Sequence, residues 1–285
     1  MAEFLQALSR YEYLQSAVLG GLLASVACGL VGTYVVVRRI SYIAGGIAHC
    51  VLGGMGAALY LQKVRHWEFA QPLLGAVVAA LAAAMIIGWV SLRARQREDT
   101  IIGALWAIGM AVGVIFISLT PGYREDLMSY LFGNILMVGR GDLWLIAALD
   151  ALVVAVCLLF YNQFLAVCFD EEQARLRGLR VEFYYLLLLA LTALTVVLLS
   201  VVVGIVLVIA LLTLPVAVAA NFARRLWQMM LLAVALSVVL TSAGIALGYQ
   251  ADLPAGATII VLAGALYLVV ILARWLWMRR PSRNA

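Results

Sequence analysis

The chain has 285 residues, of which 66% are hydrophobic and only 12% are charged. Charged residues make up roughly a quarter of an ordinary soluble domain, so this composition excludes a water-soluble globular protein. The net charge is +5, but the basic residues lie between apolar stretches, which favours topology signals over a phosphate-binding face and argues against a nucleic-acid partner.

Nine apolar stretches predict transmembrane helices, because each approaches the roughly 20 residues that cross a bilayer. In chain order they span 15–37, 42–62, 70–92, 100–120, 142–162, 182–201, 203–220, 227–249 and 254–276. The sixth and seventh meet near Gly204 with almost no loop, so they form either a tight hairpin or one bent element. We therefore expect an all-α bundle of eight or nine spans, with residues 1–285 as a single transmembrane domain.

The basic residues of the loops predict the orientation of this bundle. With the N-terminus outside and an odd number of spans, 14 of the 19 Lys and Arg residues fall in inside segments. Cytoplasmic loops carry such an excess of positive charge, so we expect the N-terminus outside and the C-terminus in the cytoplasm.

Two loops are longer than simple connections. The outside loop, 121–141, contains the apolar stretch "SYLFGNILMV", which is too short to cross and predicts an interfacial or re-entrant helix. The inside loop covers 163–181. No phosphate-binding loop occurs in the sequence, so any ATP must be bound by another chain.

The stretch "YIAGGIAHCVLGG", residues 42–54, places a histidine inside an apolar helix. At helical spacing, glycines precede and follow His49 by four residues on one stripe, and they flank Cys50 in the same way on the next. One interpretation is a packing face, because small residues let membrane helices approach closely. The other is an ion path, because ionisable groups within membrane helices are rare and line functional routes, and imidazole is the commonest transition-metal ligand.

Asp150 is a second charge inside an apolar stretch. It is either a protonated acid bonded to another helix or a hard oxygen ligand for a cation. At 1.5 Å per residue, His49 lies roughly 10 Å from the inner face of the bilayer core and Asp150 roughly 18 Å. That offset leaves open whether the two residues share one site or act as sequential stations.

The inside loop contains "DEEQARLRG", which predicts a short helix. Asp170 is the expected N-cap and Gln173 the N3 residue of a capping box, with Glu171 and Glu172 in the favoured first turn and Gly178 just after the end. So short a helix needs a surface to hold it, either lipid headgroups or a partner protein. The acidic start favours a protein partner over an anionic leaflet.

Pro215, in "LLTLPVAVAANFARR", lies inside a predicted span. Proline removes the hydrogen bond to the carbonyl of Leu211, so we expect the helix to kink or split there.

Four motifs in chain order resemble the zinc- and manganese-type ABC transporter permeases. They are "VVRRISYIAGGIAHCVLGG", "FDEEQARLRG", "VGIVLVIALLTLPVAVAA" and "DLPAGA". The resemblance runs from about residue 14 to 275. It implies a permease subunit that imports a divalent transition metal, zinc or manganese, through the bacterial cytoplasmic (inner) membrane, with no permanently bound cofactor.

The resemblance also implies partners and site residues. The partners are a second permease copy in a homodimer, a cytoplasmic ATP-binding subunit that hydrolyses the ATP, and an extracytoplasmic metal-binding protein. The segment around 170–178, including Ala174, is the implied coupling helix seated in the ATPase, and His49 the implied histidine of the metal path.

One departure from the family pattern concerns the ligands. The family has an aspartate four residues before the histidine, and this chain has Gly45. Either Asp150 supplies an oxygen from another helix, or Cys50 alters the ligand set, or the transported ion differs. Imidazole and thiol favour zinc, whereas carboxylates favour manganese.

Two other functions fit less well. An ion-coupled secondary transporter predicts interrupted helices in matching halves, and only the stretch at Pro215 is interrupted. An intramembrane protease needs a motif such as HExxH or a paired serine and histidine, and His49 has no such companion in the sequence.

Overall fold

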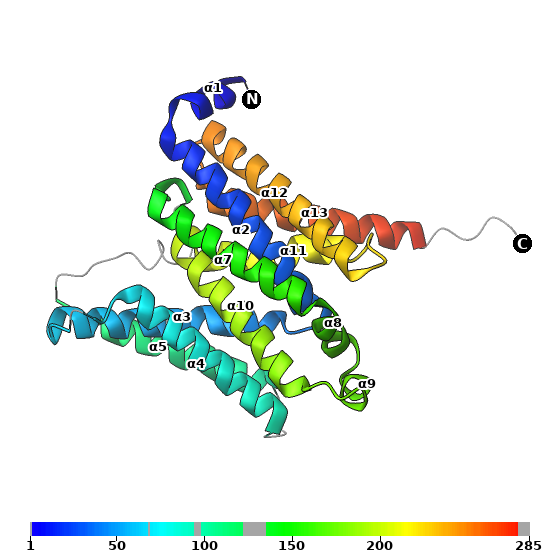
Figure 1. Ribbon diagram of the computed structural model, residues 1–285. Coiled ribbons are helices and arrows are strands. Elements are labelled where there is room, and N and C mark those ends of the chain that lie inside the picture. Colours follow the sequence, from blue (N-terminus) through cyan, green and yellow to red (C-terminus); the bar gives the residue numbers. More distant parts are fainter. Residues whose placement is uncertain (1, 68, 94–97, 122–134, 279–285) are drawn as a thin grey trace, which may run out of the picture.

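A computed structural model describes residues 2–67, 69–93, 98–121 and 135–278. Every regular element in these ranges is a helix (Figure 1). The helices are α1 (Ala2–Arg10), α2 (Glu12–Val37), α3 (Ser41–Val64), α4 (Pro72–Arg93), α5 (Glu98–Ser118), the 3₁₀ turn η1 (Ile135–Met137), α7 (Arg140–Leu159), α8 (Tyr161–Phe169), α9 (Glu171–Leu176), α10 (Val181–Val203), α11 (Ile205–Ala219), α12 (Leu226–Ala251) and α13 (Ala255–Met278).

The expected all-α, multi-span fold class is confirmed. Eight of the described helices, α2, α3, α4, α5, α7, α10, α12 and α13, have the length and composition to cross a membrane. The remaining predicted stretch forms α11, whose 15 residues extend about 22 Å at 1.5 Å per residue, short of a core of about 30 Å. A single residue, Gly204, separates α10 from α11, and its φ of 95° is one that glycine adopts readily. The expected near-absence of a loop there is confirmed.

The helices form two groups. In the first group, α2 packs against α7, α11 and α12. Helices α3, α4 and α5 form a second group beside it, drawn in blue to teal in Figure 1. Helix α10 contacts α2 in the first group and α3 and α4 in the second, so it joins the two. His49 and Cys50 are on α3, in the second group, whereas Asp150 is on α7, in the first.

Glycines bring the helices of the second group into close contact. A Cβ atom added at Gly53 would lie 2.7 Å from the carbonyl oxygen of Gly109 on α5, and one at Gly56 would lie 2.8 Å from that of Gly113. On another side of α3, Gly54 meets the backbone of Gly75 on α4. Such contacts between small residues are how membrane helices pack. Two sides of α3 are therefore closed by backbone contact.

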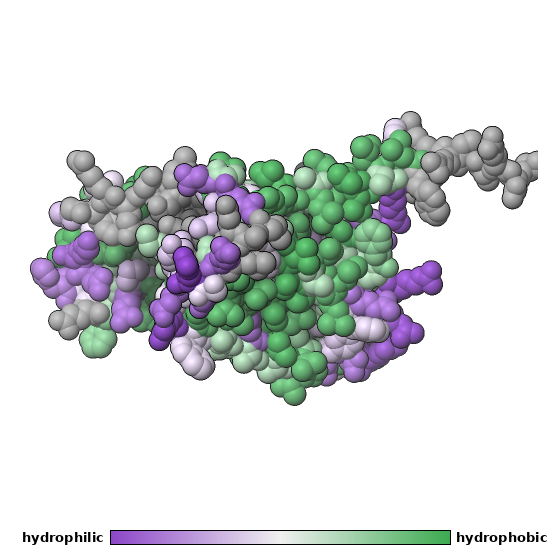
Figure 2. All heavy atoms as spheres, turned by 90° about the horizontal axis from the view of Figure 1, so that it is seen from above, coloured by the Kyte–Doolittle hydropathy of each residue, from purple (hydrophilic) through white to green (hydrophobic). Residues whose placement is uncertain are grey.

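The molecular surface matches a membrane environment. In the view of Figure 2, a broad hydrophobic area lies between groups of hydrophilic residues toward the ends of the molecule. Among the described helices, α5 and α13 are the least buried of the long ones. The predicted interfacial helix in the outside loop falls mostly on residues 122–134, which lie outside the described residues. The orientation of the termini stays a prediction.

Candidate functional site

His49 lies two turns into α3, with only 9% of its surface exposed. Its imidazole stacks on the indole of Trp106 from α5, with ring centroids 4.3 Å apart and planes 10° from parallel. Trp106 in turn lies near Tyr42, at the start of α3, with centroids 6.0 Å apart. Within the described residues, the imidazole stacks on Trp106 and forms no hydrogen bond. The ring nitrogens at its edge are therefore free to bind another group.

Gly45 lies one helical turn before His49 and opens onto space. Its residue surface is buried, yet a Cβ atom added there would meet nothing within 4 Å. At the adjacent Gly46, in contrast, a Cβ atom would lie 2.7 Å from the side chain of Ile102 on α5. The position where the family pattern has an aspartate thus has room for a larger side chain or for a passing ion.

Cys50 faces a different way. Its thiol donates to the carbonyl oxygen of Leu105 at 3.3 Å, and its backbone packs against Gly109. Both partners are on α5, so Cys50 lies in the helix–helix contact. The thiol already has a partner there, and its role as a metal ligand stays a prediction.

Asp150 lies between α7 and α2, beside Ala27 and Cys28. It is 7% exposed, and neither carboxylate oxygen has a hydrogen-bond partner within the described residues. No group of three or more His, Cys, Asp or Glu side chains able to hold a metal occurs in the described part of the chain. His49, Cys50 and Asp150 therefore do not form one three-ligand site.

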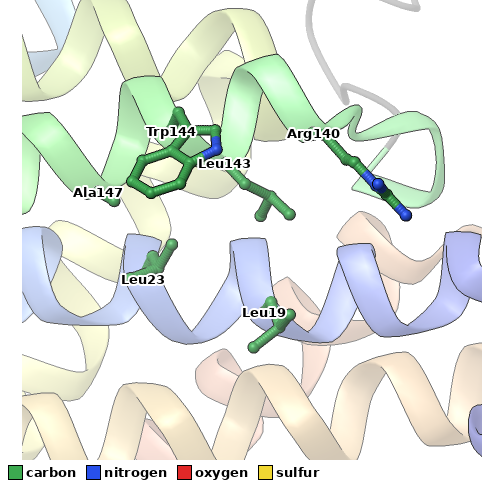
Figure 3. A pocket seen from close by; sticks show the side chains of 6 residues that line it. All are labelled: Leu19, Leu23, Arg140, Leu143, Trp144 and Ala147. Atoms are coloured by element: carbon green, nitrogen blue, oxygen red, sulfur yellow. The ribbon is translucent and has the colours of Figure 1, made fainter.

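The groove between α2 and α7 has no ligands suited to an ion. Its volume is about 320 Å³, and its walls are formed by the side chains shown in Figure 3: Leu19, Leu23, Arg140, Leu143, Trp144 and Ala147. Arg140 also forms an exposed ion pair with Glu12, 3.3 Å apart. A nearly apolar wall with one arginine repels a cation, so we assign no metal path here.

The predicted helix in the inside loop is present as α9, and it is capped at both ends. The Asp170 side chain accepts a hydrogen bond from the backbone N–H of Gln173 at 2.9 Å, as an N-cap does. At the other end Gly178 has a φ of 77°, its N–H bonds to the carbonyl of Arg175, and the next N–H bonds to that of Ala174. This pair of bonds is a Schellman motif. The predicted N-cap Asp170 and the predicted C-terminal Gly178 are confirmed, whereas the return bond of a capping box, from the Gln173 side chain to the Asp170 N–H, is not found among the described residues. The role of α9 in coupling stays a prediction.

Arg38, at the end of α2, makes contacts with distant helices that its sequence context does not predict. Its guanidinium forms an ion pair with Glu171 at the start of α9 and donates to the carbonyl of Val167 on α8 at 3.0 Å. It also lies over the ring of Tyr185 on α10, 5.3 Å from the ring centroid. The sequence indicated only a topology signal. The signal that could have suggested the ion pair is the combination of Arg38 and Arg39 at one helix end with Glu171 and Glu172 at the start of a helix in the same inside region.

Helix α11 continues through Pro215 to Ala219, so the proline does not split it. The expected kink stays a prediction. Pro215 itself is buried.

A multi-span helical bundle with one buried histidine beside open space, and a capped helix outside the long spans, defines a class: a membrane-spanning transport subunit. The comparison with known families makes this specific. Residues 10–274 match the ABC 3 transport family, and the chain belongs to that family. The family resemblance, and with it the expected ABC-transporter permease, is confirmed.

Individual relatives are similar over nearly their whole length. An uncharacterized membrane protein of Synechocystis, slr2045, is 44% identical over 93% of this chain and 92% of that protein. The manganese transport system membrane protein MntC of Halalkalibacterium halodurans is 35% identical over 93% of this chain and 88% of that protein. Among solved structures, PsaBC from Streptococcus pneumoniae in complex with Fab matches with a TM-score of 0.82 and 30% identity, over 94% of each chain.

Proposed function

We propose that the chain is the permease subunit of an ABC importer that carries a divalent transition metal, manganese or zinc, through the bacterial cytoplasmic membrane. A separate cytoplasmic subunit hydrolyses the ATP, an extracytoplasmic binding protein delivers the ion, and two permease copies form the path between them. The observation that carries the proposal is that the likeness to MntC, a manganese transport system membrane protein, spans both His49 and α9.

In this proposal His49 contacts the ion in transit. A buried neutral imidazole binds transition metals, and the nitrogens at the edge of this ring are not occupied by protein donors or acceptors in the described residues. Trp106 covers one face of the ring and holds its plane. The space at Gly45 leaves room for an ion that keeps part of its water shell. One imidazole with water binds weakly, which suits an ion that must leave again.

The ligands near His49 bear on the choice between zinc and manganese. Zinc prefers imidazole and thiolate, whereas manganese accepts oxygen ligands, including water. With the thiol of Cys50 already donating to Leu105, imidazole and water remain, and this set does not exclude manganese. The name of the Halalkalibacterium relative supports manganese as the first ion to test.

Helix α9 is the proposed docking element for the ATP-binding subunit. Ala174 is buried against the permease, whereas Leu176 and Phe169 are 88% and 68% exposed. Leu176 ends α9 and Phe169 ends the preceding α8, and large apolar side chains exposed on both sides of a polar segment favour a protein interface. Beside α9 lies an open groove of about 370 Å³, bordered by Arg175, Leu179 and the first turn of α10. A partner that closes on ATP binding would press on this helix and shift the permease between outward- and inward-open states.

The direct test is reconstitution of the chain in lipid vesicles with the ATP-binding subunit and the binding protein of the same bacterium. We expect uptake of radioactive Mn²⁺ or Zn²⁺ that requires ATP, the binding protein and both subunits. Absence of a stable complex with the ATP-binding subunit would refute the assignment. Uptake driven by an ion gradient without ATP would support a secondary transporter instead.

A further inference from the structure

We infer that Arg38 is a positioning residue that ties α9 to the junction between α2 and α3, so that a displacement of α9 reaches the helix that carries His49. The use of this link in transport rests on the proposed function, whereas the link itself is a matter of contacts. Within the described residues, the partners of the Arg38 guanidinium lie on three other helices, α8, α9 and α10.

The guanidinium of Arg38 contacts three other helices. Arg38 joins α9 through the ion pair with Glu171, α8 through the carbonyl of Val167, and α10 through the ring of Tyr185. A planar guanidinium can donate in two directions and stack on a ring at the same time, and an ammonium group cannot. The site thus requires arginine and not merely a positive charge.

A short, hydrogen-bonded turn connects Arg38 directly to α3. Arg38 is the C-cap of α2, and Arg39 adopts a left-handed conformation with φ of 63°. The N–H of Arg39 bonds to the carbonyl of Val36, and the N–H of Ile40 bonds to that of Val35. These bonds form a Schellman motif, and α3 starts at Ser41. A displacement of the Arg38 backbone is therefore transmitted to the start of α3 through this hydrogen-bonded turn.

A second branch runs through Tyr185. Its hydroxyl donates a hydrogen bond to the hydroxyl of Ser91 on α4 at 3.4 Å. Helix α4 packs on α3 backbone to backbone where Gly75 meets Gly54. The α9 helix thus reaches α3 both along the chain and across α10 and α4, and Arg38 takes part in both routes.

The neighbouring arginine provides a matched control. Arg39 is adjacent in sequence, carries the same charge and is exposed. Arg38→Lys and Arg39→Lys both keep the positive charge that sets topology. They differ in whether a guanidinium with three partners is lost. Glu171→Gln removes one partner from the other side.

The transport experiment compares these variants in the reconstituted complex described above. We expect Arg38→Lys to lower the number of Mn²⁺ ions imported per ATP hydrolysed at least fivefold while the affinity for the ATP-binding subunit changes less than threefold. Glu171→Gln should act in the same direction, and the double variant should be no worse than Arg38→Lys, because both remove one interaction. Arg39→Lys should stay within twofold of the unmodified chain. Unchanged uptake by Arg38→Lys, or a loss that merely follows lost binding of the subunit, would overturn the inference.

A chemical readout tests the link without any partner. Cys168, next to Val167 on α8, is 7% exposed and lies near Arg38. Burial raises the pKa of its thiol to about 12 and also keeps the reagent from the sulfur, so maleimide labelling is slow while the contact holds α8 in place. In the chain alone in lipid nanodiscs, Arg38→Lys should speed labelling of the Cys168 peptide at least fivefold, as followed by mass spectrometry, and Arg39→Lys should not. Equal labelling rates for the two variants would refute the link. If the unmodified complex shows no ATP-driven uptake, the proposed function fails and this labelling result still decides the inference.

Discussion

The surroundings of His49 and of α9 differ in how firmly they are held. His49 has a stacked ring beside it and open space one turn away at Gly45. Helix α9, with only 6 residues, is capped at both ends and joined to α2 by the ion pair of Arg38 and Glu171. One region is sparse in polar contacts and the other is dense in them.

The difference agrees with what each region must do under the proposed function. An ion in transit has to bind and then leave, so a single ligand with room around it is preferable to a complete coordination shell. A segment that transmits force has to move as one body with its attachment, which requires several directional contacts.

Removal of the imidazole should have the largest effect. Loss of an outer-shell partner at a metal site already costs 10- to 100-fold, so His49→Ala should lower ATP-driven Mn²⁺ uptake by at least about 100-fold. Binding of the ATP-binding subunit should be unchanged. The matched control is His66→Ala, because His66 is the other histidine and is exposed between α3 and α4. Uptake by His49→Ala equal to that of the control would remove His49 from the path.

A charge on the exposed face of α9 should weaken docking. Leu176 is 88% exposed, and burial of such an anchor at an interface contributes about 2 kcal/mol, or roughly 30-fold in affinity. Leu176→Asp should therefore weaken association with the ATP-binding subunit by about that factor. Leu253→Asp, at an exposed leucine between α12 and α13, should leave the affinity unchanged. Equal affinities of the two variants would show that α9 is not the docking element.

The sequence predicted most of the fold, because in a bilayer the length of an apolar stretch determines whether a helix spans it. Eight predicted spans correspond to long helices, with ends a few residues away. The caps of α9 were predictable because they depend on local residue types within a few positions. The apolar stretch 203–220 was also visible, but α11 comprises only 15 of its residues, because Gly204 and the turn after Ala219 end the helix.

The contacts of the candidate site were less predictable because they join residues far apart in sequence. Spacing placed His49 and Gly53 on one stripe, yet Gly53 packs against Gly109 of α5 while Gly45, on that same stripe, faces open space. The partner of His49, Trp106, lies 57 positions along the chain, with no motif to mark it. Periodicity shows which residues share a face but not which helix covers that face.

Gly45 offers a way to sharpen the contrast within α3. Because a Cβ atom there meets nothing within 4 Å, Gly45→Asp should fold and place a carboxylate one turn from His49. An added oxygen ligand favours manganese over zinc, so the ratio of Mn²⁺ to Zn²⁺ uptake should rise by roughly fivefold, or about 1 kcal/mol. Gly45→Ala is the control for size and should leave the ratio unchanged. An unchanged ratio in Gly45→Asp would place the ion away from this turn.

At the adjacent Gly46, unlike at Gly45, even a methyl group should lower the stability of the fold. A Cβ atom at Gly46 would lie 2.7 Å from Ile102, so Gly46→Ala should force α3 and α5 apart and cost about 1–3 kcal/mol in unfolding free energy. Thermal unfolding in detergent measures this as a lower midpoint, with Gly45→Ala within about 0.5 kcal/mol of the unmodified chain. Equal midpoints for the two alanine variants would mean that α5 does not close this side of α3.

The smallest effect on transport is expected at Asp150, because it lies against α2, beside Ala27 and Cys28, and the described residues hold no three-ligand metal site that would join it to His49 and Cys50. Its carboxylate oxygens have no hydrogen-bond partner in the described residues, so it is not held in a network that transport would have to break. Asp150→Asn preserves the shape of the side chain and removes its ability to carry charge. We expect Mn²⁺ uptake within about twofold of the unmodified chain, the size of effect typical of a residue outside the path. A loss approaching that of His49→Ala would instead make Asp150 a second station for the cation, as ionisable groups that line an ion path inside a membrane are. The contrast between a sparse ion site and a densely bonded coupling segment would then extend over two stations, one on α3 and one between α7 and α2.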